Sequence, residues 1–274
     1  MENKSKVLEH LNIPRSSFYY HSLLDQKDLT LKERIEKVLV DNPSYGHKRM
    51  AMELTMNKKR VRRVMKKYNI KPRRSRPKPS KSKGNEKYEA SPNLLVSLFP
   101  LFLNHVWITD FTYLRWRGGW VYVCTVLDLF SREVLGLSLK TNHGAMLVSE
   151  ALLNALQNNP SPTVIHSDQG SEYKSKLFRM ILKDFNINQS MSKKASPWQN
   201  GYQESFYGNW KIDLGDVNRF KSLGELTAEI YKSIYYYNYH RIHTALKMSP
   251  KNFALKFAQK EEIKYNINVK ELTV

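Results

Sequence analysis

Three acidic residues are spaced along the chain in a way that suits a metal-binding cleft. Asp110 ends a β-branched run, Asp168 directly follows another, and Glu204 comes after 35 intervening residues. Three carboxylates in one cleft repel each other unless cations neutralise them, and hard oxygen ligands favour Mg²⁺ or Mn²⁺. The interpretation depends on the combination, because a single Asp or Glu is usually a turn or surface residue. Asp128 and Glu172 are assigned to a turn and to a flank.

The elements around these acids predict how they could meet. The first three strands follow each other so closely that we expect them to be antiparallel, and helices and strands then alternate. If the strands that carry Asp110 and Asp168 are parallel neighbours, both side chains emerge where open α/β sheets build their sites. The order predicts an α/β fold with a ribonuclease-H-like mixed sheet flanked by helices. The strands are expected at residues 105–113, 119–127, 132–139, 163–166 and 187–190, and the helices at 145–156, at 175–185 and around Glu204.

Positive charge is concentrated in one stretch. Residues 57–84 contain 14 Lys or Arg and no Asp or Glu, out of a net charge of +20 for the whole chain. The first half of the stretch has an apolar helical stripe, whereas three prolines in the second half predict an extended linker. A cationic helix suits phosphate contacts, although a charge run is often only a solvated face. The expected DNA contacts of this helix are Lys58, Lys59, Arg60, Arg62, Arg63, Lys66 and Lys67.

Two further helices are expected before the basic one. Thr30 and Glu33 have the spacing of a capping box, and the helix that follows is expected to end at residues 42–43. Ser44 then begins a second short helix. Three short helices with a cationic third one are typical of an all-α helix-turn-helix domain, so we expect this domain to precede the sheet.

Composition excludes several classes of protein. The single cysteine, Cys124, cannot form an internal disulfide and is expected to be a small buried residue of the second strand. The N-terminus lacks a secretory pattern, and the longest apolar stretch, at residues 94–103, is too short for a membrane span and contains a proline. We therefore expect a cytoplasmic protein that binds a polyanion, associated with the bacterial nucleoid.

Several motifs occur in the order typical of one enzyme family. W-I-T-D-F-T-Y, H-S-D-Q-G-S-E-Y and N-G-Y-Q-E-S-F resemble the D-D-35-E motif of retroviral-integrase-type transposases. The segment Y-Y-Y-N-Y-H-R-I-H-T-A-L-K-M-S-P resembles the one that closes the catalytic domain of insertion-sequence transposases of the two-reading-frame kind. S-Y-G-H-K-R-M and N-K-K-R-V-R-R-V-M resemble their helix-turn-helix. One departure, Gln199-Asn200-Gly201 where many relatives have Asp-Asn-Ala, leaves the acid unchanged.

The resemblance implies a transposase that cleaves and transfers DNA strands. Asp110, Asp168 and Glu204 would be its catalytic residues and would hold two Mg²⁺ or Mn²⁺ ions about 4 Å apart. Lys211, seven residues after Glu204, would contact a phosphate near the cut. Arg241 would contact DNA or lock the terminal helix to the core, and we expect the same of His243. His166, two residues before Asp168, is expected to be a packing residue and not a metal ligand.

The resemblance also implies partners. They are the duplex DNA of the element ends and of the target, further copies of the chain in a synaptic complex, and an upstream-reading-frame protein or fusion. Two alternatives stay open: a ribonuclease-H-like nuclease that only hydrolyses, and a DNA-binding protein or decayed transposase without catalysis. The expected domains are a helical DNA-binding domain at 1–70, a basic linker at 71–95, the catalytic domain at 96–255 and a tail at 256–274.

Overall fold

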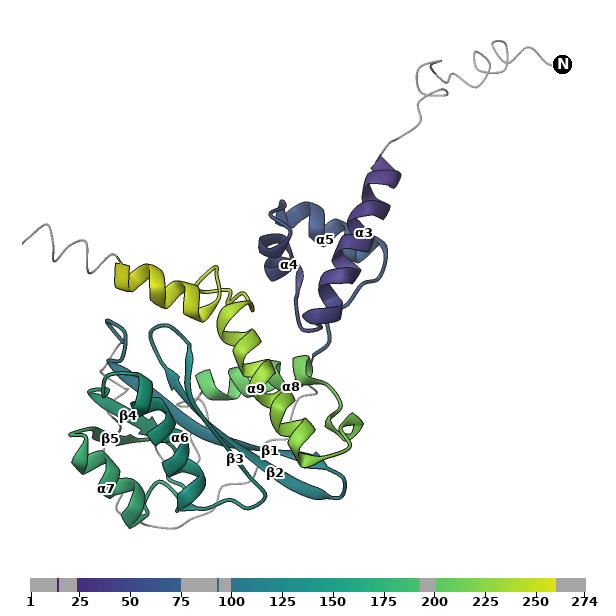
Figure 1. Cartoon of the computed structure of the whole chain (residues 1–274). Helices are drawn as coiled ribbons and strands as arrows, with labels where there is room; N and C mark the ends of the chain where they lie inside the picture. Colours follow the sequence, from purple (N-terminus) through teal and green to yellow (C-terminus); the bar gives the residue numbers. More distant parts are fainter. Residues whose placement is uncertain (1–13, 15–23, 75–92, 94–99, 193–200, 260–274) are drawn as a thin grey trace, which may run out of the picture. The chain divides into compact units, whose positions relative to one another are not determined.

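The chain folds into two compact units in the computed structural model (Figure 1). The first, called the helical unit, includes residues 24–41 and 46–71, and the second, called the sheet unit, includes residues 42–45 and those from 72 onward. Most of the linker expected at 71–95 lies outside the described residues. The structure describes residues 14, 24–74, 93, 100–192 and 201–259.

The helical unit contains the three expected helices: α3 (Leu24–Asp41), α4 (His47–Glu53) and α5 (Lys58–Lys67). The side chain of Asn57 caps α5 by accepting a hydrogen bond from the backbone N–H of Lys59. The predicted apolar stripe of α5 is confirmed, because its residues are buried between the helices. The core of the unit consists of Leu31, Ile35, Met50, Ala51, Val61, Val64 and Met65.

Two expected helix starts are wrong. Helix α3 begins at Leu24, so Thr30 lies inside it and donates its hydroxyl to the carbonyl of Gln26 instead of capping a first turn. Helix α4 begins at His47 and not at Ser44, because residues 42–45 are part of the sheet unit. A local capping pattern could not reveal either difference.

The sheet unit is built on a five-stranded mixed sheet with the strand order β3-β2-β1-β4-β5. Strands β1, β2 and β3 pair antiparallel, whereas β4 lies parallel to both β1 and β5. The predicted ribonuclease-H-like arrangement is therefore confirmed. The strands are β1 (Val106–Trp116), β2 (Gly119–Asp128), β3 (Val134–Lys140), β4 (Val164–Ser167) and β5 (Asn188–Met191).

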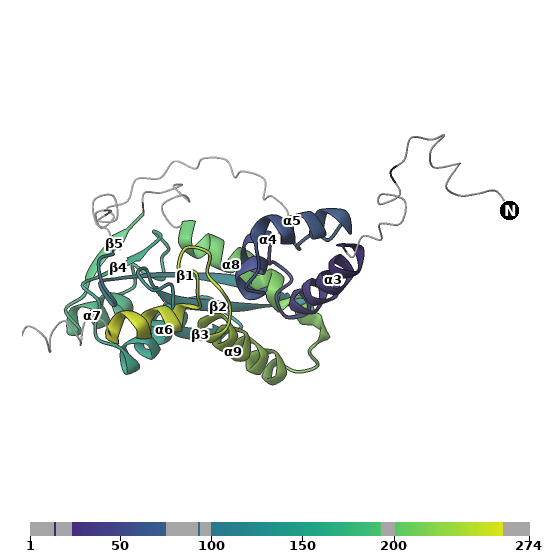
Figure 2. The same cartoon turned by 90° about the horizontal axis from the view of Figure 1, so that it is seen from above.

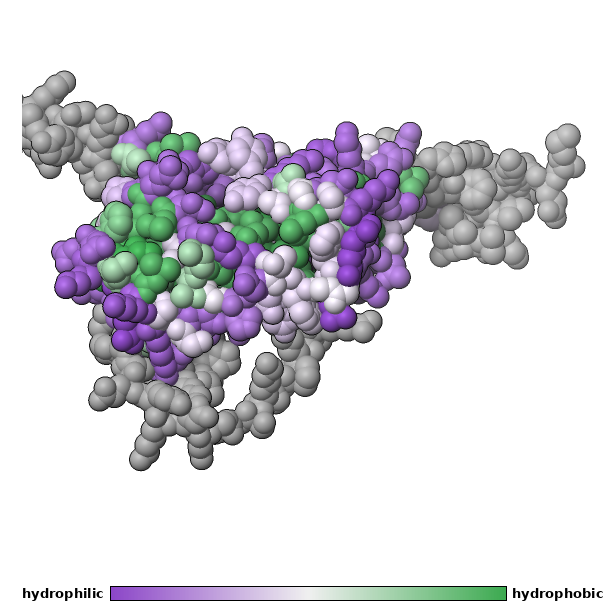
Figure 3. All heavy atoms as spheres, turned by 60° about the horizontal axis from the view of Figure 1, so that its bottom comes forward, coloured by the Kyte–Doolittle hydropathy of each residue, from purple (hydrophilic) through white to green (hydrophobic). Residues whose placement is uncertain are grey.

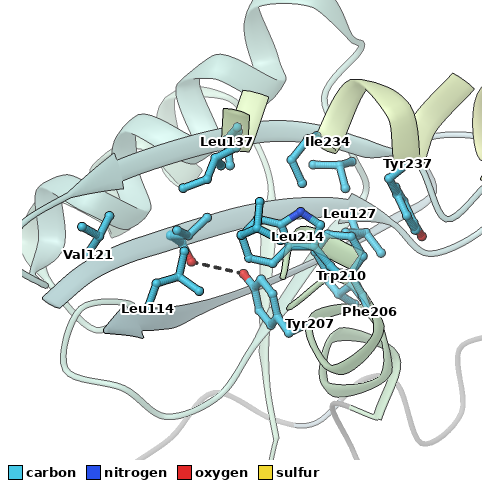
Figure 4. Close-up of a cluster of buried hydrophobic side chains, with 14 of the residues drawn as sticks. Leu114, Val121, Leu127, Leu137, Phe206, Tyr207, Trp210, Leu214, Ile234 and Tyr237 are labelled. Atoms are coloured by element: carbon cyan, nitrogen blue, oxygen red, sulfur yellow. Dashed lines mark hydrogen bonds between the residues drawn. The ribbon is translucent and has the colours of Figure 1, made fainter. Parts of the chain in front are cut away.

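Helices cover both faces of this sheet and create two apolar cores. Helices α6 (Ala145–Asn158) and α7 (Lys176–Asp184) pack on one face, and α7 lies beside β4 and β5 (Figures 1 and 2). Helices α8 (Gly201–Leu214) and α9 (Leu223–Tyr239) pack on the other, with the short helix η3 (Val217–Arg219) between them. Figure 4 shows the aromatic side chains of α8 and α9 in this second core.

The hairpin of β1 and β2 is longer than expected. Arg117 and Gly118 both have positive φ, at 45° and 82°, which is typical of the two-residue turns that join twisted antiparallel strands. Pairing therefore continues to Trp116 and Gly119. The first strand, expected to end at residue 113, runs to Trp116, six residues past Asp110.

A close approach of α6 to the sheet depends on Gly136 of β3. A Cβ atom at this position would lie 2.1 Å from the carbonyl oxygen of Ala151 and 2.8 Å from the Cβ of Ala155. Any side chain here would push α6 away from the sheet. The buried Cys124, as predicted a small core residue, belongs to the same core.

Other parts of the sheet unit support α9 and its end. Asn42 donates to the hydroxyl of Tyr236 at 2.8 Å, and the buried Tyr45 accepts from the backbone N–H of Ile242 at 2.6 Å.

Residues 250–259 form a further helix. The surface view in Figure 3 shows apolar patches bordered by hydrophilic residues. None of the described helices is long and apolar enough to cross a membrane.

Candidate active site

Asp110 and Asp168 meet where two parallel strands separate. The parallel pairing of β1 with β4 ends at Ile108 and His166, and each acid follows two residues later on its own chain segment. Because side chains alternate along a strand, Asp110 shares a face with Ile108, which packs in the core under α8 and α9. The sheet thus brings the first two predicted acids to the same edge.

The surroundings of the two carboxylates differ. Asp110 is half-buried, and one of its oxygens accepts the backbone N–H of Phe111 at 2.8 Å. Asp168 stands at the surface, yet the protein around it raises the pKa of its carboxyl through desolvation, and the negative charge of Glu172 adds to this. A hydrogen bond of 2.9 Å from the backbone N–H of Gly170 has the opposite effect. A neighbouring cation would favour the ionised form of Asp168.

Helix α8 is fastened to the strands beside Asp110. The buried Gln203 donates to the carbonyls of Ile108 and Thr125 at 3.1 and 3.3 Å. One turn later, the hydroxyl of Tyr207 donates to the carbonyl of Asp110 at 2.6 Å and lies 2.8 Å from the Thr125 hydroxyl. Figure 4 shows Tyr207 reaching from α8 toward the sheet. These bonds fix the start of α8, which carries the third predicted acid.

Glu204 follows Gln203 directly, in the first turn of α8, and its side chain is exposed. Among the described residues, no three His, Cys, Asp or Glu side chains stand close enough together to hold a metal ion. The structure therefore brings Asp110 and Asp168 to one edge and puts Glu204 next to an anchor at that edge, without a closed set of three ligands. The donors are hard carboxylate oxygens, which fit Mg²⁺ or Mn²⁺.

Lys211 lies two turns along α8 from Glu204. Its Nζ donates to the carbonyl of Tyr113 at 2.8 Å and stands 5.3 Å from the centre of the Tyr113 ring. The side chain is half-buried and leans along β1, three residues past Asp110. Lys211 is thus a positive charge beside the strand that carries the first acid.

Comparisons with known proteins agree over nearly the whole chain. Two models of the integrase core domain match residues 103–197 and 186–250. The putative transposase InsK of insertion sequence element IS150 from Escherichia coli K12 is 33% identical over 88% of this chain and 89% of its own. The chain belongs to the insertion-sequence transposases with an integrase core domain. It is a polynucleotidyl transferase of DNA transposition, and its family implies dependence on a divalent metal.

A second transposase matches this chain over a similar length. The transposase of insertion sequence element IS904 from Lactococcus lactis is 33% identical over 81% of this chain and 92% of its own. Among solved structures, the catalytic core domain of HTLV-2 integrase in complex with magnesium is 20% identical, with a TM-score of 0.45. That alignment covers 57% of the transposase chain and 99% of the integrase domain.

Sequence reasoning missed a histidine–carboxylate contact beside Asp168. Glu172, assigned to a flank, is 8% exposed, and its carboxylate lies 2.8 Å from Nδ1 of His143. A Cβ atom at Gly170 would lie 2.9 Å from a Glu172 oxygen and 3.0 Å from an Asp168 oxygen, so the two carboxylates flank this glycine. The acid four residues after Asp168 in the same loop is the sequence signal for this pair, but its His partner precedes α6 and cannot be found by spacing.

Two histidines and an aspartate that drew attention in the sequence have structural roles. His166 is fully buried, its Nδ1 lies 2.8 Å from the Ser190 hydroxyl, and burial lowers its pKa to about 4. The predicted packing role of this residue is confirmed. Asp128 caps a turn as predicted, accepting the backbone N–H groups of Phe130 and Asn104. His243 is half-buried and pairs through its backbone with Met248.

Arg241 locks the end of α9 to the rest of the sheet unit. Its side chain is only 5% exposed, and its Nε lies 2.6 Å from the carboxylate of Asp213 at the end of α8. A second nitrogen donates to the hydroxyl of Ser44 at 2.8 Å. Of the two roles expected for Arg241, the structure supports the lock. The guanidinium is buried and paired with Asp213 and Ser44, and the DNA contact stays a prediction.

The basic helix α5 separates its cations into two groups. Arg63 and Lys67 reach across to α3, where Arg63 holds the fully buried Asp28 through two hydrogen bonds of 2.5 and 2.7 Å. Lys67 binds both Asp25 and Asp28. These pairs lower the pKa of the Asp28 carboxyl, chiefly through the hydrogen bond from Arg63. The exposed cations of α5 that point away from this cluster are Lys58, Lys59, Arg62 and Lys66.

Proposed function

We propose that this transposase cleaves and joins DNA strands at a site formed by Asp110, Asp168 and Glu204. The observation that supports it best is the matched position of Asp110 and Asp168 beyond the last paired residues of β1 and β4. The two bonds that Tyr207 and Gln203 of α8 make to this part of the sheet support the assignment of Glu204 as third member.

Two divalent ions, Mg²⁺ or Mn²⁺, would be held by these three carboxylates. Bound there, such ions lower the pKa of an attacking water or hydroxyl and stabilise the oxygen that leaves. The work of the protein is to orient the carboxylates. β1 and β4 fix the backbone of Asp110 and the start of the Asp168 loop, and the hydrogen bond from Gly170 holds one Asp168 oxygen. Glu204 is free to turn toward them from the first turn of α8.

The reaction has two parts that use the same phosphoryl chemistry. In cleavage, a water oxygen attacks a phosphorus of the DNA, and the bond from phosphorus to the 3′-oxygen breaks. In joining, the freed 3′-hydroxyl attacks a phosphorus of a second strand, and one phosphodiester replaces another. The number of phosphodiester bonds does not change in joining, so this step needs no external energy source. Lys211 would neutralise charge on a phosphate near the cut.

DNA binding outside the site is assigned to the exposed cations of α5, which we propose contact the phosphates of the element ends. These are Lys58, Lys59, Arg62 and Lys66, with the half-buried Arg60 beside them. His243 stays a candidate for a DNA contact near the end of α9. Joining two ends to a target requires several copies of the chain, so the active form is proposed to be a homo-oligomer, with or without an upstream-frame partner. The bacterial relatives support action on nucleoid DNA in the cytoplasm.

The test is an assay of cleavage and joining with purified full-length protein. A labelled duplex that carries the ends of the element is incubated with Mg²⁺ or Mn²⁺, and the wild type is compared with Glu204→Gln. Glu229→Gln is the matched control, because this acid of α9 lies outside the proposed site, 3.7 Å from Arg219 of η3. DNA affinity of each variant is measured in parallel.

The proposal expects nicked and joined products from the wild type and from Glu229→Gln, and neither product from Glu204→Gln, with DNA affinity unchanged. Nicking without joining would favour the hydrolytic nuclease. Binding without either product, with and without the upstream-frame protein, would favour a DNA-binding protein that has lost catalysis.

A further inference from the structure

One face of the β1–β2 hairpin carries aromatic rings, two of which are exposed in the part of the chain that the structure describes. Tyr113 and Tyr122 are paired across the two strands, and so are Arg115 and Trp120, so their side chains lie on the same face. Tyr113 is 53% exposed and Trp120 is 41% exposed. Large aromatic side chains are usually buried in a sheet, because removing their large apolar surface from water contributes strongly to folding free energy. This exposed pair is the core of what we call the aromatic platform.

The rings of the platform are held in place by one another. The Tyr113 and Trp120 rings meet edge to face with their centres 5.0 Å apart, and the Arg115 guanidinium lies 4.9 Å from the centre of the Trp120 ring. Further along the same face, the half-buried Tyr122 ring lies 5.0 Å from the ring of the exposed His143. Ordered rings lose little conformational freedom when a flat partner stacks on them.

The platform is close to the candidate site. Tyr113 follows Asp110 by three residues on the same strand, a backbone separation of about 10 Å, and the two side chains leave β1 on opposite faces. Lys211 of α8 donates to the carbonyl of Tyr113 and stands over its ring. A positive charge therefore lies at the end of the platform nearest to Asp110 in the strand. Phe111, the residue after Asp110, packs against Tyr122 and His143 at the inner end of the platform.

The charge around the platform points to an anionic partner with flat groups. Arg115 forms no ion pair within the part of the chain that the structure describes, and its guanidinium stacks on a ring instead. Exposed aromatic rings beside cations are the features with which proteins bind unpaired nucleic acid, because every base has a face that can stack. A purely apolar docking surface for a second protein copy would not require cations stacked on the exposed rings.

We propose that the aromatic platform binds unpaired bases of DNA next to the strand that the transposase cuts or joins. Tyr113 and Trp120 stack on the bases, and Arg115 and Lys211 neutralise the flanking phosphates. This role rests on the proposed function only for its place in the reaction. Binding itself requires no catalysis and no metal, so it can be measured separately.

The experiment measures DNA affinity of the full chain by fluorescence anisotropy in the presence of EDTA. The probes are a fully paired duplex and the same duplex with a short single-stranded extension. The variants are Tyr113→Leu and Trp120→Leu, with Trp120→Phe as the conservative change. Tyr231→Leu is the matched control, because Tyr231 is 50% exposed on α9 and lies outside the platform.

The wild type is expected to prefer the extended duplex. Each leucine variant should weaken binding to the extended duplex roughly tenfold, the effect of losing one stacked base, and change binding to the paired duplex less than about twofold. Trp120→Phe should retain most of the preference, and Tyr231→Leu all of it. An equal loss on both probes, no loss on either, or a change in oligomeric mass with the preference intact would overturn the proposal.

Because these measurements contain no metal, loss of the preference is independent of whether Glu204→Gln stops cleavage. A chain that keeps the preference but never cuts DNA would refute the proposed function and leave the platform in place.

Discussion

Asp110 of β1 and Asp168, the first residue after β4, each lie two residues beyond the last pair of these parallel strands, Ile108 and His166. The arrangement depends on short pairing: β1 continues for six residues after Asp110, whereas β4 ends at Ser167. The chain that leaves β4 therefore diverges from β1 and opens an edge at which both carboxylates are reachable. On β1, the site therefore lies where the pairing with β4 ends and not where the strand ends.

The bond from Tyr207 to the Asp110 carbonyl should support activity as well as stability. Tyr207→Phe removes one hydrogen bond from that carbonyl and one from the buried Thr125 hydroxyl, which costs roughly 1–3 kcal/mol of folding free energy. We expect joined product to fall more than this loss of stability explains. The control is Tyr237→Phe, which removes a buried hydroxyl bound to the Arg132 carbonyl at 3.0 Å. Equal activity of both variants at equal stability would contradict the role of Tyr207.

Arg241 should act on stability and not on DNA affinity. Arg241→Met leaves the Asp213 carboxylate, 16% exposed, without its partner, and we expect a loss of about 3–5 kcal/mol in denaturant unfolding. The double variant Arg241→Met with Asp213→Leu should recover part of this loss, because no charge is then left unpaired. DNA affinity per folded molecule should not change. If stably folded Arg241→Met lost DNA affinity, the result would show that Arg241 contacts DNA.

The two groups of cations on α5 should differ in their effect on DNA binding. Arg62→Ala and Lys66→Ala should each lower DNA affinity and reduce the slope of log affinity against log salt by about one. Arg63→Ala should instead destabilise the helical unit, since it leaves the buried Asp28 with fewer partners. Anisotropy titrations at several salt concentrations, with unfolding curves for each variant, separate the two. The assignment is wrong if all three variants change the salt slope alike.

The Asp28 cluster predicts that the helical unit loses stability in acid. The hydrogen bond from Arg63 holds the pKa of Asp28 below its ordinary value in the folded chain, so the folded state favours the ionised carboxylate. This contribution is fully present above about pH 4 and is lost as the pH falls through the lowered pKa. Hydrogen exchange of α3 and α5, corrected for intrinsic rates, should show the loss in the wild type. Asp28→Asn should be less stable near neutral pH and should lack this pH dependence.

Much of the sheet unit could be predicted because its signals are local. Strand alternation and helical periodicity predicted the five strands and the helices α6 and α7. The length of β1 could not be predicted in this way. It depends on a turn in which Arg117, a residue that seldom adopts positive φ, does so beside Gly118.

The partners of charged residues were the least predictable part. The stretch around α5 contains no acid, and its cations therefore appeared free for DNA. Asp28, which holds Arg63, lies 35 residues earlier on another helix. Arg241 likewise bonds to Ser44, 197 residues away in the chain. Such pairs follow from tertiary packing and leave no pattern within a short window of sequence.

The most direct test of the central claim is whether Asp168 touches the metal. Asp168→Cys replaces a hard oxygen ligand with sulfur, which Mg²⁺ accepts poorly and Mn²⁺ accepts more readily. Joining of a pre-cut element end is measured in each metal, with Asp184→Cys, an exposed position on α7, as the control. We predict that Asp168→Cys joins strands in Mn²⁺ but not in Mg²⁺, whereas Asp184→Cys is active in both. If Asp168→Cys joined strands in Mg²⁺ as fast as the wild type does, the account would be contradicted.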